Sequence, residues 1–147
     1  MPLDASYAGH TYPPAPPYLV GREKIREFAV AIGAVDPAYL DPDAARKLGY
    51  PDVIAPPTFP IVLTAAGTQT MVDDPGLGLD FSRVVHGDQR FRYTRPVHAG
   101  DLLTCTTTIE PISSRAGSDF LTSRTDVVDE AGEPVVTAWS MLVIRGA

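Results

Sequence analysis

The hydrophobic pattern changes its period near residue 82, and this change constrains the fold more than any other feature of the sequence. Beyond that point apolar and polar residues tend to alternate, as they do in strands with one covered face. Four such segments occupy residues 82–97, 101–112, 119–129 and 133–145, and short turn-forming sequences such as His98–Asp101 separate them. Valine, threonine and aromatic residues are frequent there, which favours β-strands. The second half of the chain is therefore predicted to form an antiparallel meander of four strands.

The first half begins with a proline-rich arm, followed by a helical pattern. Proline fixes its own φ and restrains the residue before it, so Thr11–Tyr18 is expected to be extended, as a surface arm or a lead-in strand. We place this arm at about residues 1–20. Residues 21–34 are predicted to form the first helix, because four apolar residues recur at helical spacing: Ile25, Phe28, Ala29 and Ile32.

Two further helices are expected, one short and one long. Asp41 is a natural N-cap before Pro42, and Gly49 offers a left-handed stop, so residues 41–49 suit a short helix. The long helix is predicted over residues 57–76, with one face formed by Ile61, Ala65, Thr68 and Met71 or Val72. Gly67 lies within this helix and lowers its stability by about 1 kcal/mol relative to alanine. A glycine at this cost suggests tight packing, in which its small size lets another backbone approach closely.

Helices followed by an antiparallel sheet define the α+β class. The sheet needs apolar cover on one face, and the long third helix is the best candidate for it. This predicts a single hotdog domain over residues 1–147, in which the antiparallel sheet wraps around a long central helix. Because one sheet leaves unpaired edges and an open face, the domain is expected to form a dimer.

Composition excludes several classes of function. The net charge of −6 argues against nucleic-acid binding, which needs a basic surface. The histidines and the one cysteine lack metal-ligand spacing, so we expect neither a metal nor another cofactor, and Cys105 is predicted to be a small buried residue. The sequence shows no N-terminal leader and no apolar run of about 20 residues, so we expect a cytoplasmic protein that does not enter a membrane.

The region from Gly33 to Pro57 reads GAVDPAYLD over residues 33–41 and APP over residues 55–57. This frame resembles the active-site region of the MaoC-like, R-specific enoyl-thioester hydratases and 3-hydroxyacyl dehydratases. Those enzymes carry Gly-Asp-x-Asn-Pro-x-His-x-Asp and, after a short helix, Ala-His-Gly. Four positions of this chain match that pattern: Gly33, Pro37, Asp41 and Ala55.

The groups that carry the family's chemistry are absent from this frame. The resemblance implies that an aspartate and a histidine act as general acid and base, worth roughly 100- to 10,000-fold in rate. A backbone N–H would stabilise the thioester oxygen by about 3 kcal/mol. Here the aspartate position is Ala34, which exchanges no proton. The histidine position is Tyr39, which is a poor substitute because a phenol is a poor base at neutral pH. The amide position is Pro57, which has no N–H.

Three longer blocks extend the resemblance over nearly the whole chain; they are GREKIREFAVAIGAVDPAYL, LGYPDVIAPPTF and VVHGDQRFRYTRPVHAGDLL. With the three departures they look like the FAS1-like dehydratase, or HadA-type, subunits, which pair with a MaoC-like chain that keeps the acid and base. The resemblance implies a non-catalytic subunit of a heteromeric R-specific 3-hydroxyacyl-thioester dehydratase. Such a subunit would shape the channel for an acyl-ACP or acyl-CoA and form a heterodimer, with a homodimer as the alternative.

Two other functions stay open. A self-sufficient hydratase could use a relocated site with His86 and Asp88, which are expected on one face of their strand, although Gly87 between them can mark a bulge. Asp36 is a further candidate acid, but an Asp-Pro step also suits a turn or cap. The third possibility is a non-enzymatic binder of acyl-thioesters, since one fold can serve several chemistries.

Substrate contacts are predicted at two places. Arg90 and Arg92 are expected to share the strand face of His86 and Asp88, where they are candidates to bind CoA phosphates or an acidic acyl carrier protein. The acyl channel is expected to be lined by residues near the start of the long helix and by one residue of the degenerate motif; the candidates are Tyr39, Phe59, Ile61 and Val62.

Overall fold

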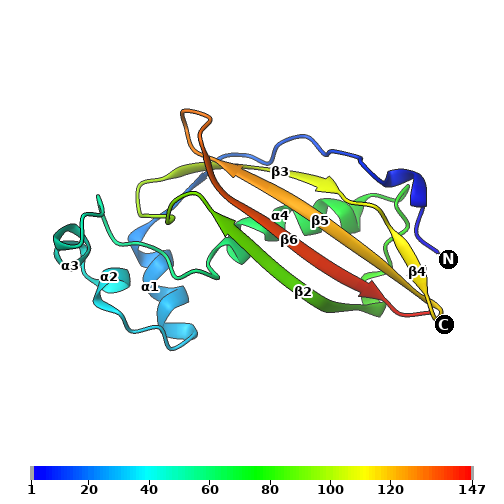
Figure 1. Cartoon of the computed structure of the whole chain (residues 1–147), viewed down its shortest axis with the longest axis horizontal. Helices are drawn as coiled ribbons and strands as arrows, with labels where there is room; N and C mark the ends of the chain where they lie inside the picture. Colours follow the sequence, from blue (N-terminus) through cyan, green and yellow to red (C-terminus); the bar gives the residue numbers. More distant parts are fainter. Residues whose placement is uncertain (1, 147) are drawn as a thin grey trace.

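A six-stranded antiparallel sheet lies over one long helix (Figure 1). The computed structural model describes residues 2–146, and the terminal residues of the predicted 1–147 domain lie outside this range. The helical elements are η1 (Ala5–Tyr7), α1 (Arg22–Ala31), α2 (Pro37–Leu40), α3 (Pro42–Lys47), α4 (Pro60–Asp73) and η2 (Phe81–Arg83). None of these helices is long and apolar enough to cross a membrane. The architecture confirms the predicted α+β hotdog fold.

The strands do not follow one another across the sheet as a meander. They are β1 (Tyr18–Leu19), β2 (Val84–Tyr93), β3 (Leu102–Ile109), β4 (Ser113–Arg115), β5 (Ser118–Val128) and β6 (Pro134–Ile144). The order is β1-β3-β5-β6-β2, with β4 paired to β5, so β2 lies beside β6 and the predicted meander is wrong. The segment 94–101 crosses between the two sides of the sheet instead of closing a hairpin. Alternation shows which face a residue takes, but it does not select the neighbouring strand.

The central helix α4 packs on the sheet through a stripe about one residue away from the predicted face. Its buried residues are Pro60, Leu63, Thr64 and Met71. The side that carries Ile61 is more open, and Ile61 itself is 40% exposed. Periodicity did not select the packed face because this helix is apolar around much of its circumference. Gly67 does mark tight packing, but a side chain and not the predicted backbone approaches it, since a Cβ there would overlap the Thr107 side chain of β3.

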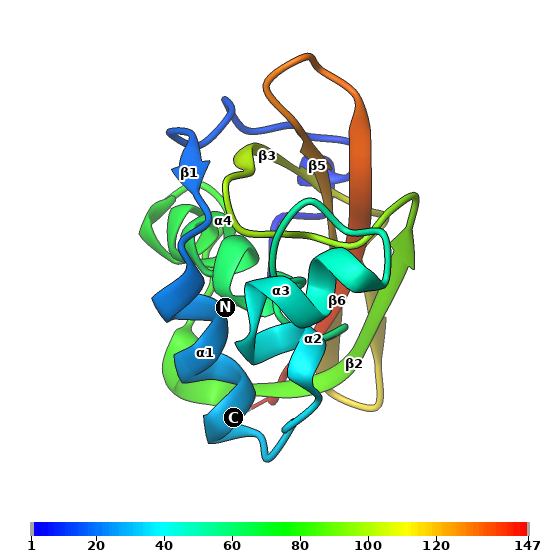
Figure 2. The ribbon, with the colours of Figure 1, turned by 90° about the vertical axis from the view of Figure 1, so that its left-hand side faces the viewer.

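Helices α1, α2 and α3 gather at one end of the molecule, beyond the end of α4 (Figure 2). In α1, Ile25 and Ala29 are buried as predicted. Ile32 was expected on the same face but is 50% exposed, because the helix ends at Ala31 and the chain turns through Gly33 at φ +73°.

Two aspartate caps define the short helices. The Asp36 carboxylate accepts a hydrogen bond from the Ala38 N–H at 2.9 Å and begins α2. The Asp41 carboxylate does the same for the Asp43 N–H at 2.9 Å and begins α3, which confirms the predicted short helix. Each carboxylate satisfies an N–H that would otherwise lack a partner at the start of a helix.

The N-terminal arm is an integral part of the sheet and of the core. Its strand β1 pairs with β3, and further upstream Thr11 forms an isolated bridge with Thr108. The Tyr12 hydroxyl donates to Asp74 at 2.9 Å, just beyond the end of α4. Cys105 on β3 is buried as predicted, and burial raises the pKa of its thiol to about 11.

Candidate functional site

A cavity of about 270 Å³ lies where the end of β2 meets the 54–57 segment. It contains two of the three degenerate motif positions, Tyr39 and Pro57, which are far apart in sequence. The third position, Ala34, lies in the loop between α1 and α2 and does not line the cavity. The lining residues are Tyr39, Ile54, Ala55, Pro57, Tyr93, Thr94, Arg95 and Pro96. We call this cavity the Tyr39–Pro57 pocket.

One local hydrogen bond and two backbone hydrogen bonds between distant segments position the walls of this pocket. The Asp36 cap sets the direction of α2, so Tyr39 packs against the buried core at the pocket edge. The 54–57 segment is held by two backbone bonds, from the Ile54 N–H to the Ala38 carbonyl at 3.0 Å and from the Ala55 N–H to the Val97 carbonyl at 2.7 Å. Because backbone groups make these two contacts, the position of the 54–57 segment depends little on which side chains stand at the motif positions.

Tyr93 lines one side of the pocket and is hydrogen-bonded to Pro57. Its hydroxyl donates to the Pro57 carbonyl at 2.6 Å. The frame that resembles MaoC-like enzymes would place an N–H donor for the thioester oxygen at Pro57, but the proline has none. Instead its own carbonyl is engaged as an acceptor. Burial, and secondarily the nearby Tyr39, raise the pKa of the Tyr93 phenol.

The residues that line the pocket include no His, Asp, Glu, Lys or Cys. Its titratable lining residues are two phenols and the Arg95 guanidinium. Arg95 makes two hydrogen bonds to the Asp101 carboxylate, at 2.9 and 2.8 Å, which raise the pKa of the guanidinium and hold it as a cation. Within residues 2–146 no group of three His, Cys, Asp or Glu side chains is placed to hold a metal ion. The lining therefore presents hydroxyls and a guanidinium, and lacks the carboxylate or imidazole that most often serves as a general base.

The raised pKa of Tyr93 predicts a loss of stability at high pH. Above pH about 10 the unfolded chain releases this proton while the folded chain keeps it, so the free energy of unfolding falls as pH rises. Tyr93→Phe is expected to lower stability at neutral pH by about 1 kcal/mol, because the bond to Pro57 is lost. In the variant the free energy of unfolding should also fall less steeply above pH about 10, by up to about 1.4 kcal/mol per pH unit. Urea unfolding from pH 7 to 11 measures both effects; parallel curves for the two proteins would contradict the second.

His86 and Asp88 do not form the predicted dyad. A register shift between them makes Gly87 a bulge, so His86 pairs with Leu142 and Asp88 with Met141. Leu142 and Met141 are consecutive residues of β6 and point to opposite faces of the sheet. His86 therefore faces α4, whereas Asp88 faces away from it. The expectation that both share one strand face is wrong, although the interpretation of Gly87 as a bulge is confirmed. Asp36, the other candidate acid, serves as the cap of α2.

The predicted substrate contacts are dispersed. Phe59 is fully buried in the core, and Val62 packs against the same core. Ile61 lines a groove beside α4 that shares no residue with the Tyr39–Pro57 pocket. Of the four predicted channel residues, only Tyr39 lines the pocket itself.

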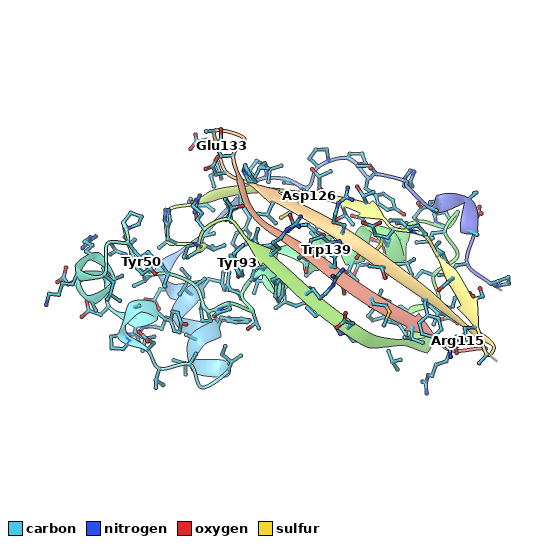
Figure 3. All side chains as sticks on the ribbon, viewed as in Figure 1. Tyr50, Tyr93, Arg115, Asp126, Glu133 and Trp139 are labelled. Atoms are coloured by element: carbon cyan, nitrogen blue, oxygen red, sulfur yellow. The ribbon has the colours of Figure 1, made fainter. Side chains whose placement is uncertain are left out.

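Arg90 and Arg92 lie on the sheet face that points away from α4. Their guanidinium carbons stand 4.8 and 5.3 Å from the ring centroid of Trp139 on β6. Figure 3 shows Trp139 near the middle of this outer face, while Tyr93 lies at the end of β2. The two arginines are therefore separated by the sheet from the groove beside α4.

Sequence reasoning missed Tyr93, Thr94 and Arg95 as pocket residues. Tyr93 ends β2 and the other two residues follow it directly, and this part of the chain lies beside the motif only after folding. The block TRPVHAGD contained one signal for an ion pair. Arg95 and Asp101 lie six residues apart, on either side of a proline and a Gly-containing turn. In the folded chain these two residues make the ion pair that holds the crossing segment.

Comparisons with known proteins show similarity along the whole chain. The family model described as "FAS1-like, dehydratase domain region" matches residues 5–138. A UPF0336 protein of Streptomyces coelicolor is 61% identical over 147 residues, covering 100% of this chain and 98% of its own length. A solved MaoC-like dehydratase superposes with a TM-score of 0.89 and 34% identity over 97% of this chain, which spans only 43% of that longer chain. A chain of the HadBC (3R-hydroxyacyl-ACP dehydratase) complex of Mycobacterium tuberculosis gives a TM-score of 0.82 and 33% identity, covering 93% of this chain and 96% of its own.

Proposed function

The chain belongs to the FAS1-like dehydratase domain family, and from this membership we propose that it is the non-catalytic, HadA-type subunit of a cytoplasmic, heteromeric R-specific 3-hydroxyacyl-thioester dehydratase in fatty acid metabolism. Its partner is a MaoC-like chain that keeps the aspartate and the histidine. The partner removes water from, or adds it to, the acyl chain of an acyl-ACP or acyl-CoA. This chain shapes part of the acyl channel and stabilises the active subunit.

The observation that carries the proposal is the Tyr39–Pro57 pocket. It has the location expected for the family's active site, but it contains no base and its proline offers no N–H to an oxyanion. The names and lengths of the relatives support the assembly. HadBC is described as a complex that acts as a 3R-hydroxyacyl-ACP dehydratase. The similar MaoC-like dehydratase chain is more than twice as long as the region matched, enough for two units of this size.

We place the partner along the edge strand β2. In the part of the chain that the structure describes, β2 pairs only with β6, so its other edge has no strand beside it. This edge is long and carries an exposed apolar residue, Val85, at 41% exposure. A long unpaired edge offers backbone N–H and C=O groups to another strand, and proteins usually cover or protect such edges. A partner sheet added at β2 would pair the open backbone groups and bury Val85.

The substitution Val85→Lys is expected to weaken this assembly about tenfold or more. Burial of a valine side chain stabilises by about 1.5 kcal/mol, and a lysine adds a charge that resists burial. Light scattering coupled to size-exclusion chromatography, with the chain and its partner mixed over a concentration series, measures the effect. Val30→Lys on α1 is the matched control, because Val30 is 61% exposed and far from the edge in sequence and fold. Equal affinities for the two variants would exclude β2 as the interface.

The function itself is tested by assaying hydration of crotonyl-CoA with the chain alone and with a MaoC-like partner. Activity should depend on the partner. Robust turnover by the highly purified chain alone would refute a non-catalytic role.

A further inference from the structure

A groove of about 470 Å³ lies between α4 and the inner face of β2 and β6. The inner face is the side of the sheet that faces α4. Two residues at the groove, Ile61 and Phe81, are 40% and 57% exposed, so it opens to the surface. The walls are mainly apolar, and their apolar residues are Ile61, Ala65, Val72, Phe81, Val84 and Leu142. A concave apolar surface of this size suits a flexible hydrocarbon chain.

One polar cluster interrupts this lining. The His86 Nε2 atom lies 3.2 Å from Ser140 Oγ and 3.3 Å from Gln89 Oε1. Gln89 pairs in register with Ser140, and the bulge at Gly87 turns His86 to the same inner face. We call His86, Ser140 and Gln89 the polar cluster; the first two line the groove directly.

The polar cluster differs from the other polar residues of the groove. Thr64 and Thr68 donate to carbonyls of α4 at 3.3 and 3.4 Å, and Gln69 donates to the Asp73 carboxylate at 2.8 Å, so each has a partner within α4. By contrast the buried Nε2 of Gln89 has no hydrogen-bond partner within residues 2–146. Turning the amide by 180° would leave its oxygen unpaired instead, so the deficit does not depend on its orientation. A buried amide without a partner costs free energy that a new hydrogen bond would recover.

We propose that this groove binds an acyl chain bearing a hydroxyl group, and that the polar cluster recognises that hydroxyl. The identity of the ligand as an acyl-thioester rests on the proposed function. A hydroxyl both donates and accepts, so it can bond to the imidazole and the serine, the two members of the polar cluster that line the groove. A plain alkyl chain in the groove would cover the polar cluster without pairing it, and binding sites built to hydrogen-bond a ligand discriminate against analogues that lack the group.

The test compares decanoyl-pantetheine with derivatives whose hydroxyl moves carbon by carbon along the chain. The protein is the full chain carrying ¹⁵N-labelled histidine, and it contains three histidines, so the ring signals of His86 can be assigned by substitution. We expect the best hydroxylated probe to bind about tenfold more tightly than the plain one by calorimetry. Its binding should shift the ring signals of His86, while those of His10 and His98 stay in place.

Variants separate recognition from folding. His86→Leu and Ser140→Ala should each remove the preference for the hydroxylated probe, while Asp88→Asn, on the opposite face of the same strand, should keep it. Thermal unfolding of each variant checks that the fold is retained. Equal binding of plain and hydroxylated probes, shifts confined to other histidines, or no binding with or without the partner would each overturn the inference. Because binding is measured without turnover, a failed dehydratase assay beside intact selectivity would reject the proposed function alone.

Discussion

Purified alone, the chain is expected to hydrate crotonyl-CoA no faster than the uncatalysed background. Addition of water across the double bond needs a group that takes a proton from water and one that returns a proton to carbon. Ala34 has no group that exchanges a proton, the phenol of Tyr39 is a poor base, and Pro57 has no N–H to donate to the thioester oxygen. Mixed with a MaoC-like chain that keeps its aspartate and histidine, turnover should rise by at least about 100-fold, because general acid–base groups typically contribute that much.

The matched control replaces the histidine of the partner with alanine and leaves this chain unchanged. That mixture should return to background, since the reacting groups are assigned to the partner alone. The assay reads loss of absorbance from the enoyl-thioester at several ratios of the two chains, and activity should saturate at a fixed ratio. Rapid turnover without a partner, or with the inactivated one, would place the chemistry in this chain instead.

Asp101→Ala is expected to have the largest effect on stability. Only 5% of the Asp101 side chain is exposed, and its carboxylate accepts two hydrogen bonds from Arg95 at 2.9 and 2.8 Å. It also accepts one from the His98 N–H at 2.9 Å. Removal leaves a partly buried guanidinium and an N–H without their partner, and breaking a buried pair in this way costs about 3 kcal/mol. For a chain of this length the midpoint of thermal unfolding should fall by about 10 °C.

Asp43→Ala provides the comparison for an exposed carboxylate. Asp43 pairs with Arg46 at 3.2 Å on the surface of α3, and 82% of its side chain is exposed. Exposed pairs contribute little because water and salt screen them, so this variant should unfold close to wild type. Calorimetry and urea unfolding of both variants give the comparison. If Asp101→Ala lowered the free energy of unfolding as little as Asp43→Ala does, the Arg95–Asp101 ion pair would not be what holds the 94–101 segment in place.

Much of the local structure could be predicted from the sequence, because short-range interactions determine it. The Asp41-Pro42 start and the Gly49 stop predict α3. The Asp36-Pro37 step suits a turn or a cap, and in the structure Asp36 caps α2. The apolar spacing of Ile25 and Ala29 identified the packed side of α1. These features depend on residues a few positions apart, so the interactions that stabilise them lie within a single segment of the chain.

The functional surfaces were predicted less completely, because they depend on contacts between distant segments. Tyr39 and Pro57 were recognised as degenerate motif positions, but Tyr93 and Arg95 join them only when β2 ends beside the 54–57 segment. The predicted His86–Asp88 pair failed because one extra residue in a strand, Gly87, reverses the face of everything beyond it. The same reversal brought His86 to Ser140, a contact that strand alternation alone does not predict.

By itself, the amino-acid sequence determined the α+β class, the caps, the alternating strand faces and the loss of an acid, a base and an amide donor from the family motif. Each of these follows from the identity of a side chain or from neighbours within a few residues. Only the tertiary structure decided that β2 lies beside β6, with no strand on its other edge within residues 2–146, which side of α4 is covered, and that a polar cluster lies in a mainly apolar groove. The reason is that strand order and helix rotation are chosen by the packing of the whole chain, in which several local solutions have similar free energies.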